Sequence, residues 1–148
     1  MNTFNINMFH LLMKNVSSNK KLETSLQELV LSGFIEVDGC YFLQKLFNQQ
    51  KHISSLDFID KTGYECFVNS IHIDDYIEED LFIQGLLYSD KIISEWLKLE
   101  NNTTLEVILS ETDFGFQIKF HVSRPNENWI LESDLNIFKE ALLILGNN

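Results

Sequence analysis

Proline and glycine are scarce in this sequence, which holds one Pro and six Gly among 148 residues. Because these residues interrupt regular structure most often, their scarcity predicts long elements joined by short loops. No run approaches the roughly 20 apolar residues that cross a bilayer. The opening residues, MNTFNINMFHLLMKN, lack the basic region and the small-residue cleavage site of a secretory signal. We therefore expect a cytoplasmic protein without a membrane segment.

Cysteine is equally rare, and the two that occur, Cys40 and Cys66, do not have CxxC spacing. Without a secretory signal, two reduced thiols are expected rather than a disulfide. A nucleophilic thiol needs a nearby base and surroundings that lower its pKa. Cys66 stands among apolar residues and Cys40 follows a turn, so we interpret both as core residues.

Basic residues are outnumbered two to one, with 11 Lys and Arg against 22 Asp and Glu, for a net charge of −11. Residues 1–73 carry a net charge of −1 and residues 74–148 a net charge of −10. Acidity gathered in one half indicates a negatively charged surface, although solubility alone is the simpler interpretation. Such a surface repels nucleic acid and anionic membranes and attracts basic proteins.

The apolar content is sufficient for a core, since apolar residues make up 45% of the chain and aromatic residues 12%. This composition excludes an intrinsically disordered tail, and the length is typical of one domain. No repeat, low-complexity tract or linker divides the chain. We expect residues 1–148 to form a single acidic α+β domain. Its predicted parts are N-terminal helices, a mostly antiparallel sheet, a central helix and a closing C-terminal helix.

The first third is predicted to be helical. Apolar residues at positions 4–12 follow the spacing of a core-facing helical stripe. A second stripe, at positions 22–30, follows a cap at Ser17 or Ser18 and precedes Gly33, which suits the left-handed position after a helix.

Strands are predicted next. Asp38-Gly39 lies between FIEV and CYFL, which predicts a hairpin with a two-residue turn. A helix from Tyr41 to Asn48 is the alternative, because the apolar residues there also fit the helical period. The run YECFVNSIHI, residues 64–73, is rich in aromatic and β-branched residues and predicts a strand.

Five carboxylates follow within seven residues: Asp74, Asp75, Glu78, Glu79 and Asp80. Because carboxylates interact favourably with a helix N-terminus, we expect the central helix to begin among them and to continue towards Leu99. Gly85 and Ser89 mark points at which it divides into two helices, with Ser89 capping the second.

The last third has the clearest pattern. Residues 105–110 and 116–123 alternate apolar and polar side chains around a turn at Glu111–Gly115, which predicts an antiparallel hairpin with one face on the core. A short strand is predicted at Trp129-Ile130. A closing helix capped by Ser133 would then contain Leu135, Phe138, Leu142 and Leu145.

Histidine chemistry has little support. His72 and Asp74 share one face of a predicted strand, but a zinc site needs a third ligand, and nothing brings the candidate, His121, near. We interpret His72 as bonded to acidic neighbours and His121 as a surface residue beside Lys119. The DFG run at 113–115 lacks the other kinase motifs, and no GxxxxGK[ST] or GxGxxG occurs. We therefore predict no catalytic residue, metal or cofactor, and no enzymatic activity.

The segment from Leu105 to Leu135, LEVILSETDFGFQIKFHVSRPNENWILESDL, resembles the C-terminal part of bacterial immunity proteins. These proteins are encoded beside contact-dependent growth-inhibition toxins and other polymorphic toxins. The resemblance lies in the acidic strand-turn-strand with Phe-Gly at the turn exit, the KFH run, Trp129 and the closing helix. The upstream run NSIHIDDY fits the same pattern.

This resemblance implies a small cytoplasmic protein that binds a cognate toxin domain before the toxin acts. Many such toxins are nucleases, whose clefts are basic because they hold phosphate. The expected interface combines the carboxylates of the acidic half with two tyrosines, since tyrosine is frequent at binding hot spots. Core packing is the alternative for each tyrosine. The interface set comprises Asp74, Asp75, Tyr76, Glu78, Glu79, Asp80, Tyr88, Glu111, Asp113 and Glu127.

Two other functions fit the residues. One is a different acidic inhibitor or adaptor, such as a phage-encoded blocker of a nucleic-acid-binding enzyme. The other is a small metal-dependent hydrolase built on His72. Exposed aromatic residues would equally suit a contact between two copies of the chain.

Overall fold

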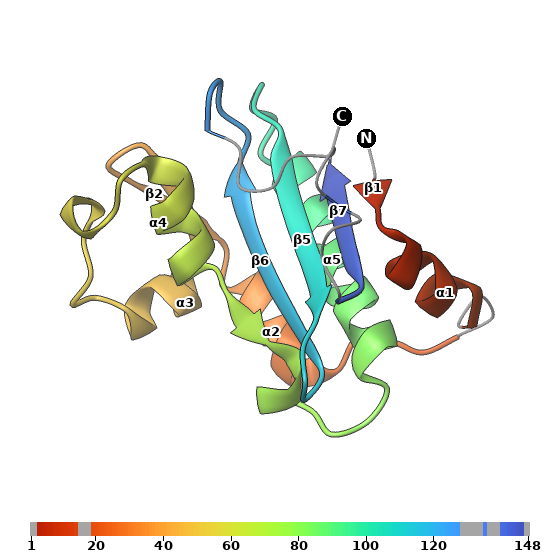
Figure 1. The fold of residues 1–148 in the computed structure, drawn as a ribbon. Coiled ribbons are helices and arrows are strands. Elements are labelled where there is room, and N and C mark those ends of the chain that lie inside the picture. Colours follow the sequence, from red (N-terminus) through yellow and green to blue (C-terminus); the bar gives the residue numbers. More distant parts are fainter. Residues whose placement is uncertain (1–2, 15–18, 128–134, 136–139, 147–148) are drawn as a thin grey trace.

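The computed structural model describes residues 3–14, 19–127, 135 and 140–146. These residues form an antiparallel five-stranded sheet of order β1-β7-β5-β6-β4 and a separate two-stranded sheet of β2 and β3 (Figure 1). The strands are β1 (Thr3–Phe4), β2 (Phe34–Val37), β3 (Cys40–Leu43), β4 (Ile71–His72), β5 (Leu105–Glu111), β6 (Phe116–Val122) and β7 (Leu142–Gly146). The α+β class and the mostly antiparallel sheet are confirmed.

Helices cover the sheet and both its flanks. They are α1 (Ile6–Lys14), α2 (Thr24–Leu31), α3 (Gln44–Gln49), α4 (Lys61–Val68) and α5 (Leu81–Leu97), with 3₁₀ turns η1 (Ser55–Asp57) and η2 (Ile73–Asp75). In the view of Figure 1, α5 lies behind the central strands, α3 and α4 group with the β2–β3 hairpin beside β6, and α1 lies beyond β7. In the described ranges, no helix has both the length and the apolar character that crossing a membrane requires.

The main core lies between the sheet and α5. Val107, Leu109, Ile118 and Phe120 are buried on this face, as the alternation along residues 105–123 predicts. Trp96 of α5 anchors the β2–β3 hairpin to this core. Its ring packs edge-on against Phe34 at 5.2 Å and Tyr41 at 5.1 Å between ring centroids.

The turn residues of the first hairpin behave as predicted. Asp38 and Gly39 both have positive φ, 53° and 77°, which matches the right-handed twist of the flanking strands. The helical alternative is wrong for β3, although α3 begins immediately after it at Gln44. Gly33 ends α2 with φ of 88°, but α2 begins at Thr24 after Glu23, so the predicted cap at Ser17 or Ser18 is wrong.

The strand predicted over residues 64–73 is wrong for most of its length. Residues 61–68 form α4, because the Asp60 side chain caps this helix by accepting a hydrogen bond from Gly63 N at 2.7 Å. Tyr64 and Val68, one helical turn apart, both pack into a small core under the β2–β3 hairpin. Only Ile71–His72 pairs with β6. Local β propensity is here overridden by the cap and by packing.

The central helix begins later than predicted and is not divided. The chain turns through η2, and α5 starts at Leu81, after Asp80 in a left-handed conformation. The helix continues through Gly85. Glycine at this position allows the helix to pack closely on the sheet, since a Cβ there would stand only 3.1 Å from a methyl of Leu109. Ser89 donates its hydroxyl hydrogen to Gly85 O at 2.8 Å and caps no helix.

The closing helix is wrong at its C-terminal end, where Leu142–Gly146 is strand β7. It lies between β1 and β5, so its continuous apolar run is that of a central strand with two covered faces. Leu135 packs with Leu142, Ile144 and Ile108 in a buried cluster. The predictions at Trp129, Ile130, Ser133 and Phe138 lie outside the described residues.

Candidate functional site

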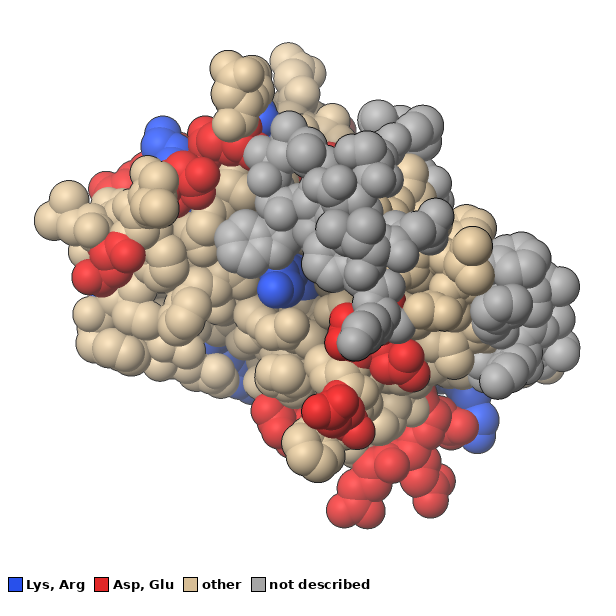
Figure 2. Space-filling model, viewed as in Figure 1, with Lys and Arg blue, Asp and Glu red and all other residues tan. Residues whose placement is uncertain are grey.

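Two acidic segments that are distant in sequence meet at one end of the sheet. Strand β4 pairs His72 with Gln117 of β6, so the residues after β4 lie beside the β5–β6 turn. The approach is close, since a Cβ on Gly115 would stand 2.7 Å from Asp74 Oδ1. We define the acidic end as Asp74, Asp75, Glu78, Glu79, Asp80, Glu111 and Asp113. Figure 2 shows carboxylates gathered along the lower edge of the molecule, where this part of the chain lies in Figure 1.

The β5–β6 turn adds an apolar side chain to the acidic end. Thr112 and Gly115 close the turn, with Thr112 N donating to Gly115 O at 2.8 Å and Gly115 N donating to Thr112 Oγ1 at 3.1 Å. Asp113 and Phe114 form its tip, and the Phe114 side chain is 84% exposed. Sequence analysis missed Phe114 as an interface residue. The available signal was a large aromatic residue at the tip of a hairpin, where no inward position exists.

Two lysines border the acidic end, because Lys20 and Lys21 line the same hollow as Glu78, Glu79 and Asp80. Lys20 Nζ lies 3.3 Å from Asp80 Oδ2, and both side chains are about half exposed, at 58% and 44%. The buried Gln84 holds residues 21–23 in place. Its side chain accepts from Glu23 N at 2.9 Å and donates to Lys21 O at 2.8 Å. A polar hollow of about 570 Å³ separates this segment from the acidic loop. An exposed pair like Lys20–Asp80 contributes little stability.

One carboxylate of the acidic end, that of Asp74, is in an unfavourable environment. Asp74 Oδ1 is covered by protein, yet no described group donates a hydrogen bond to it. A covered charged oxygen without a donor is unfavourable for folding. The position of this carboxylate is therefore not explained by stability.

Two predicted interface residues, Tyr88 and Glu127, do not join the acidic end, and a third, Tyr76, is only partly exposed beside it. Tyr88 is fully buried in the main core, so its prediction as a surface anchor is wrong, and burial raises the pKa of its hydroxyl. Glu127 lies elsewhere and accepts from Thr62 N at 3.2 Å, so its placement with the acidic residues is also wrong. Tyr76 is half-buried against the core, and burial and the nearby Asp75 raise its pKa.

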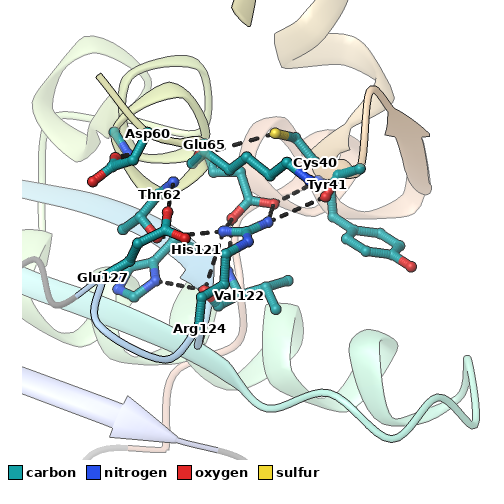
Figure 3. Close-up of polar contacts among 12 residues, drawn as sticks. Cys40, Tyr41, Asp60, Thr62, Glu65, His121, Val122, Arg124 and Glu127 are labelled. Atoms are coloured by element: carbon teal, nitrogen blue, oxygen red, sulfur yellow. Dashed lines mark hydrogen bonds and ion pairs between the residues drawn. The ribbon is translucent and has the colours of Figure 1, made fainter. Parts of the chain in front are cut away.

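A second polar cluster is buried and centres on Glu65 of α4 (Figure 3). Its carboxylate has no exposed surface and faces Arg124, with Oε1–Nη1 and Oε2–Nη2 distances of 2.7 and 2.8 Å. Oε1 also accepts from Val122 N at 2.9 Å, and Oε2 from Tyr41 N at 2.6 Å. Glu65 therefore joins α4 to both sheets. We call this set, with Asn69, the buried hub.

Asn69 completes the buried hub one helical turn later. Its side chain accepts from Leu43 N at 3.2 Å and donates to Tyr41 O at 3.0 Å and Phe120 O at 3.4 Å. These bonds satisfy backbone groups at the edges of β3 and β6, which need partners because they are buried. Sequence analysis assigned no role to Glu65, Asn69 or Arg124, because their partners are distant in sequence.

His121 lies on the predicted polar face, but it is only 1% exposed, so its interpretation as a surface residue is wrong. Its Nδ1 lies 2.9 Å from Val122 O and its Nε2 lies 3.2 Å from Glu106 Oε2. The imidazole lowers the pKa of the Glu106 carboxyl against an opposing effect of burial. His72, by contrast, is exposed at the end of β4.

Burial keeps the thiols of the two cysteines protonated. Burial is the main reason that the thiol pKa of Cys40 rises to about 11 and that of Cys66 to about 12, so neither forms a thiolate readily. Both cysteines are free and buried, as predicted. Among the residues that the structure describes, no three His, Cys, Asp or Glu side chains are grouped to hold a metal ion.

Comparisons with known proteins place the chain in a family. The profile of the uncharacterized protein PM0498 family matches residues 3–148. Uncharacterized protein PM0498 of Pasteurella multocida (strain Pm70) is 30% identical over 144 residues, covering 88% of this chain and 89% of that protein. No solved structure matches the chain. This chain belongs to the uncharacterized protein PM0498 family.

Proposed function

We propose that this chain is a cytoplasmic immunity protein whose acidic end binds a basic domain of a cognate toxin, such as a nuclease cleft. It would act by occlusion and not by catalysis. The observation that carries the proposal is the convergence of residues 74–80 and 111–113 on one exposed surface. Seven carboxylates are gathered there from segments separated by about thirty residues. Within the described residues, Asp74 Oδ1 is covered without a donor, and Asp80 forms only an exposed pair with Lys20.

The charge of the partner follows from electrostatics. A cleft that holds nucleic-acid phosphates is lined with Lys and Arg, and its field favours an acidic surface. Complementary charge mainly accelerates association, from a neutral ~10⁵–10⁶ M⁻¹s⁻¹ towards ~10⁸–10⁹ M⁻¹s⁻¹ at low salt. Fast capture suits an inhibitor that must act before a toxin reaches its target.

Phe114 supplies what charge alone does not. Binding energy at interfaces is concentrated in a few large side chains that leave water, surrounded by polar residues that contribute less. Phe114 projects from the turn at 84% exposure, with Asp113 beside it and Asp74 packed against Gly115. In this proposal the carboxylates guide the partner and Phe114 holds it.

The test is association kinetics with the product of the neighbouring gene, co-purified and assayed for cleavage of RNA and DNA. The variant reverses Asp75, Glu78 and Glu79 to Lys, and keeps Asp80 because of its left-handed backbone and its pair with Lys20. We expect the association rate at low salt to fall about tenfold or more and its salt dependence to flatten.

A matched control reverses the exposed Glu28, Glu36 and Asp90 to Lys, which changes net charge equally away from the acidic end and avoids left-handed positions. We expect a much smaller effect from it. Phe114→Ser should leave the association rate nearly unchanged and raise the dissociation rate about tenfold. Equal effects of the two triple variants, or unchanged binding by the acidic-end variant, would refute this surface as the interface.

A further inference from the structure

A group of apolar side chains is exposed around η1 and α4. In Figure 1, α4 lies at the left of the sheet, whereas the β5–β6 turn of the acidic end lies at the bottom. Leu56 is 93% exposed, Ile59 is fully exposed at 105%, and Phe67 is 50% exposed. Single exposed apolar residues are ordinary, but three large ones within twelve residues form a patch that water does not favour. Folding does not explain the patch, because these side chains bury little.

The patch contains a groove of about 520 Å³. Its floor is aromatic, since Phe58 stacks on the buried Tyr64 with 5.2 Å between ring centroids and contacts Phe67 at 5.6 Å. Gly63 also lines the groove, and a Cβ there would stand 3.1 Å from Asp60 Oδ1. The residues that line the groove are Asp57, Phe58, Ile59, Asp60, Thr62, Gly63 and Phe67.

Local hydrogen bonds hold the groove in shape. Ser54 and Asp57 cap η1 reciprocally, with Leu56 N donating to Ser54 Oγ at 3.3 Å and Ser54 N donating to Asp57 Oδ2 at 2.8 Å. Asp60 Oδ1 accepts from Gly63 N at the start of α4. The loop between these two caps is only two residues long, so a ligand would find the groove already formed. Preformed sites lose less entropy on binding.

The charge around the groove selects its occupant. Asp57 and Asp60 lie in its wall, and each commits one carboxylate oxygen to a local bond, which leaves the other for a partner. The adjacent Lys61 does not neutralise them, because its side chain lies along the β2–β3 turn, where its Nζ would stand 2.7 Å from a Cβ on Gly39. The groove thus combines an apolar floor with an acidic wall.

We propose that this groove binds a polypeptide segment of a partner protein in which an apolar side chain is flanked by Lys or Arg. The apolar side chain fills the space above Phe58 beside Ile59, and the flanking cations meet Asp57 and Asp60. This site is independent of the acidic end. One partner can contact both, but neither surface requires the other.

The probe is a short capped peptide, Gly-Lys-Leu-Arg-Gly, added to the isotopically labelled full chain while amide signals are followed by NMR. We expect the signals of residues 57–67 to move as peptide is added. The dissociation constant should be about 1 mM or lower, as for a single small anchor. Two peptide controls share the scaffold: Gly-Glu-Leu-Glu-Gly removes the cations and Gly-Lys-Ala-Arg-Gly removes the anchor. Each should bind at least about tenfold more weakly.

Variants on the protein separate groove binding from general stickiness. Ile59→Ser removes a fully exposed side chain, so the fold is unaffected, and we expect at least about tenfold weaker binding. Leu56→Ser is the matched control, because Leu56 is as exposed but does not line the groove. Asp57→Asn with Asp60→Asn keeps both caps while removing both charges, and should weaken binding severalfold and flatten its salt dependence.

Three outcomes would overturn the proposal. Equal binding of the acidic peptide would show that charge does not select the ligand. Equal losses from Leu56→Ser and Ile59→Ser would show diffuse hydrophobic attraction. Movement of the same signals on raising protein concentration without peptide would assign the patch to contact between two copies. The acidic-end triple variant, tested with the same peptide, should bind normally, so this result and that of the proposed function can be told apart.

Discussion

Carboxylates serve opposite purposes in two regions of this molecule. In the buried hub, Glu65 has no exposed surface and accepts four hydrogen bonds, two from Arg124 and two from backbone N–H groups of different sheets. At the acidic end, seven carboxylates crowd an exposed edge, and Asp74 Oδ1 is covered without a donor among the described residues. The same chemical group is fully satisfied in one region and left largely to solvent in the other.

The difference separates charge that holds the fold from charge that is free for a partner. A buried carboxylate is tolerated only when its hydrogen bonds and counter-ion are complete, as in the buried hub. Carboxylates held close together at a surface repel one another, so their grouping needs a reason other than stability. Breaking each region should therefore have opposite consequences for folding and for binding.

The largest expected effect is loss of the Glu65 carboxylate. Glu65→Ala leaves the largely buried Arg124 without its carboxylate partner, and Val122 N and Tyr41 N lose the Glu65 acceptor. Removal of one member of a buried pair typically destabilises a protein by about 3–5 kcal/mol. Urea unfolding followed by circular dichroism measures this change. Glu28→Ala, at an exposed residue 3.9 Å from Lys45, is the control and should change stability by less than about 0.5 kcal/mol. A loss under about 1 kcal/mol for Glu65→Ala would remove the distinction between the two regions.

The next variant should change stability in the opposite direction. It tests whether a buried polar group stabilises the fold only when it is hydrogen-bonded. Tyr88 is fully buried, but its hydroxyl has no partner among the described residues. Tyr88→Phe should leave stability unchanged or raise it by up to about 1 kcal/mol, because it removes an unsatisfied group and keeps the ring. Thermal unfolding measures it. Tyr41→Phe, which removes a hydroxyl that bonds Glu36, should be slightly destabilising under the same conditions.

Most of the fold follows from periodicity. The β5–β6 hairpin alternates apolar and polar side chains, and Asp38-Gly39 specifies a tight turn, so both were predictable from neighbouring residues. Helix α4 was not predictable in this way, because its composition favours a strand and its state depends on the Asp60 cap and on packing under β3. Strand β7 was misread because a short apolar run fits a buried strand and a buried helix equally.

The candidate sites divide along the same line. Carboxylates 74–80 are adjacent in sequence and were found, whereas their meeting with the 111–113 turn depends on the β4–β6 register. The buried hub was missed because Glu65 and Arg124 are 59 residues apart. Tyr88 was misassigned because tyrosine serves equally in cores and interfaces, and only its inward position on α5 decides between them.

Glu106 combines features of the two regions, because its side chain is partly exposed but contacts the buried His121. Its replacement should have a smaller, pH-dependent effect on stability. Contact with His121 lowers the pKa of its carboxyl below the usual 4.5. A lowered folded-state pKa adds stability that is present above pH 4.5 and is lost as pH falls through the folded-state pKa. The stability difference between the wild type and Glu106→Gln should therefore be present above pH 4.5 and shrink as the pH falls through the folded-state pKa of Glu106. Unfolding midpoints measured from pH 3 to 7 test this, and a difference that is constant with pH would contradict it.

The smallest effect on folding should come from the region proposed for binding. Neutralising Asp75, Glu78 and Glu79 as Asn, Gln and Gln removes three repelling charges without changing side-chain size, so stability should stay level or rise by about 0.5 kcal/mol at low salt. The gain should fade as salt shortens the screening length to a few ångströms. The same variant should associate more slowly with the toxin domain that we propose as the partner, although its fold is no weaker. A protein that becomes slightly more stable while binding worse carries its carboxylates for the partner, whereas a stability loss comparable to that of Glu65→Ala would show that the acidic end is structural after all.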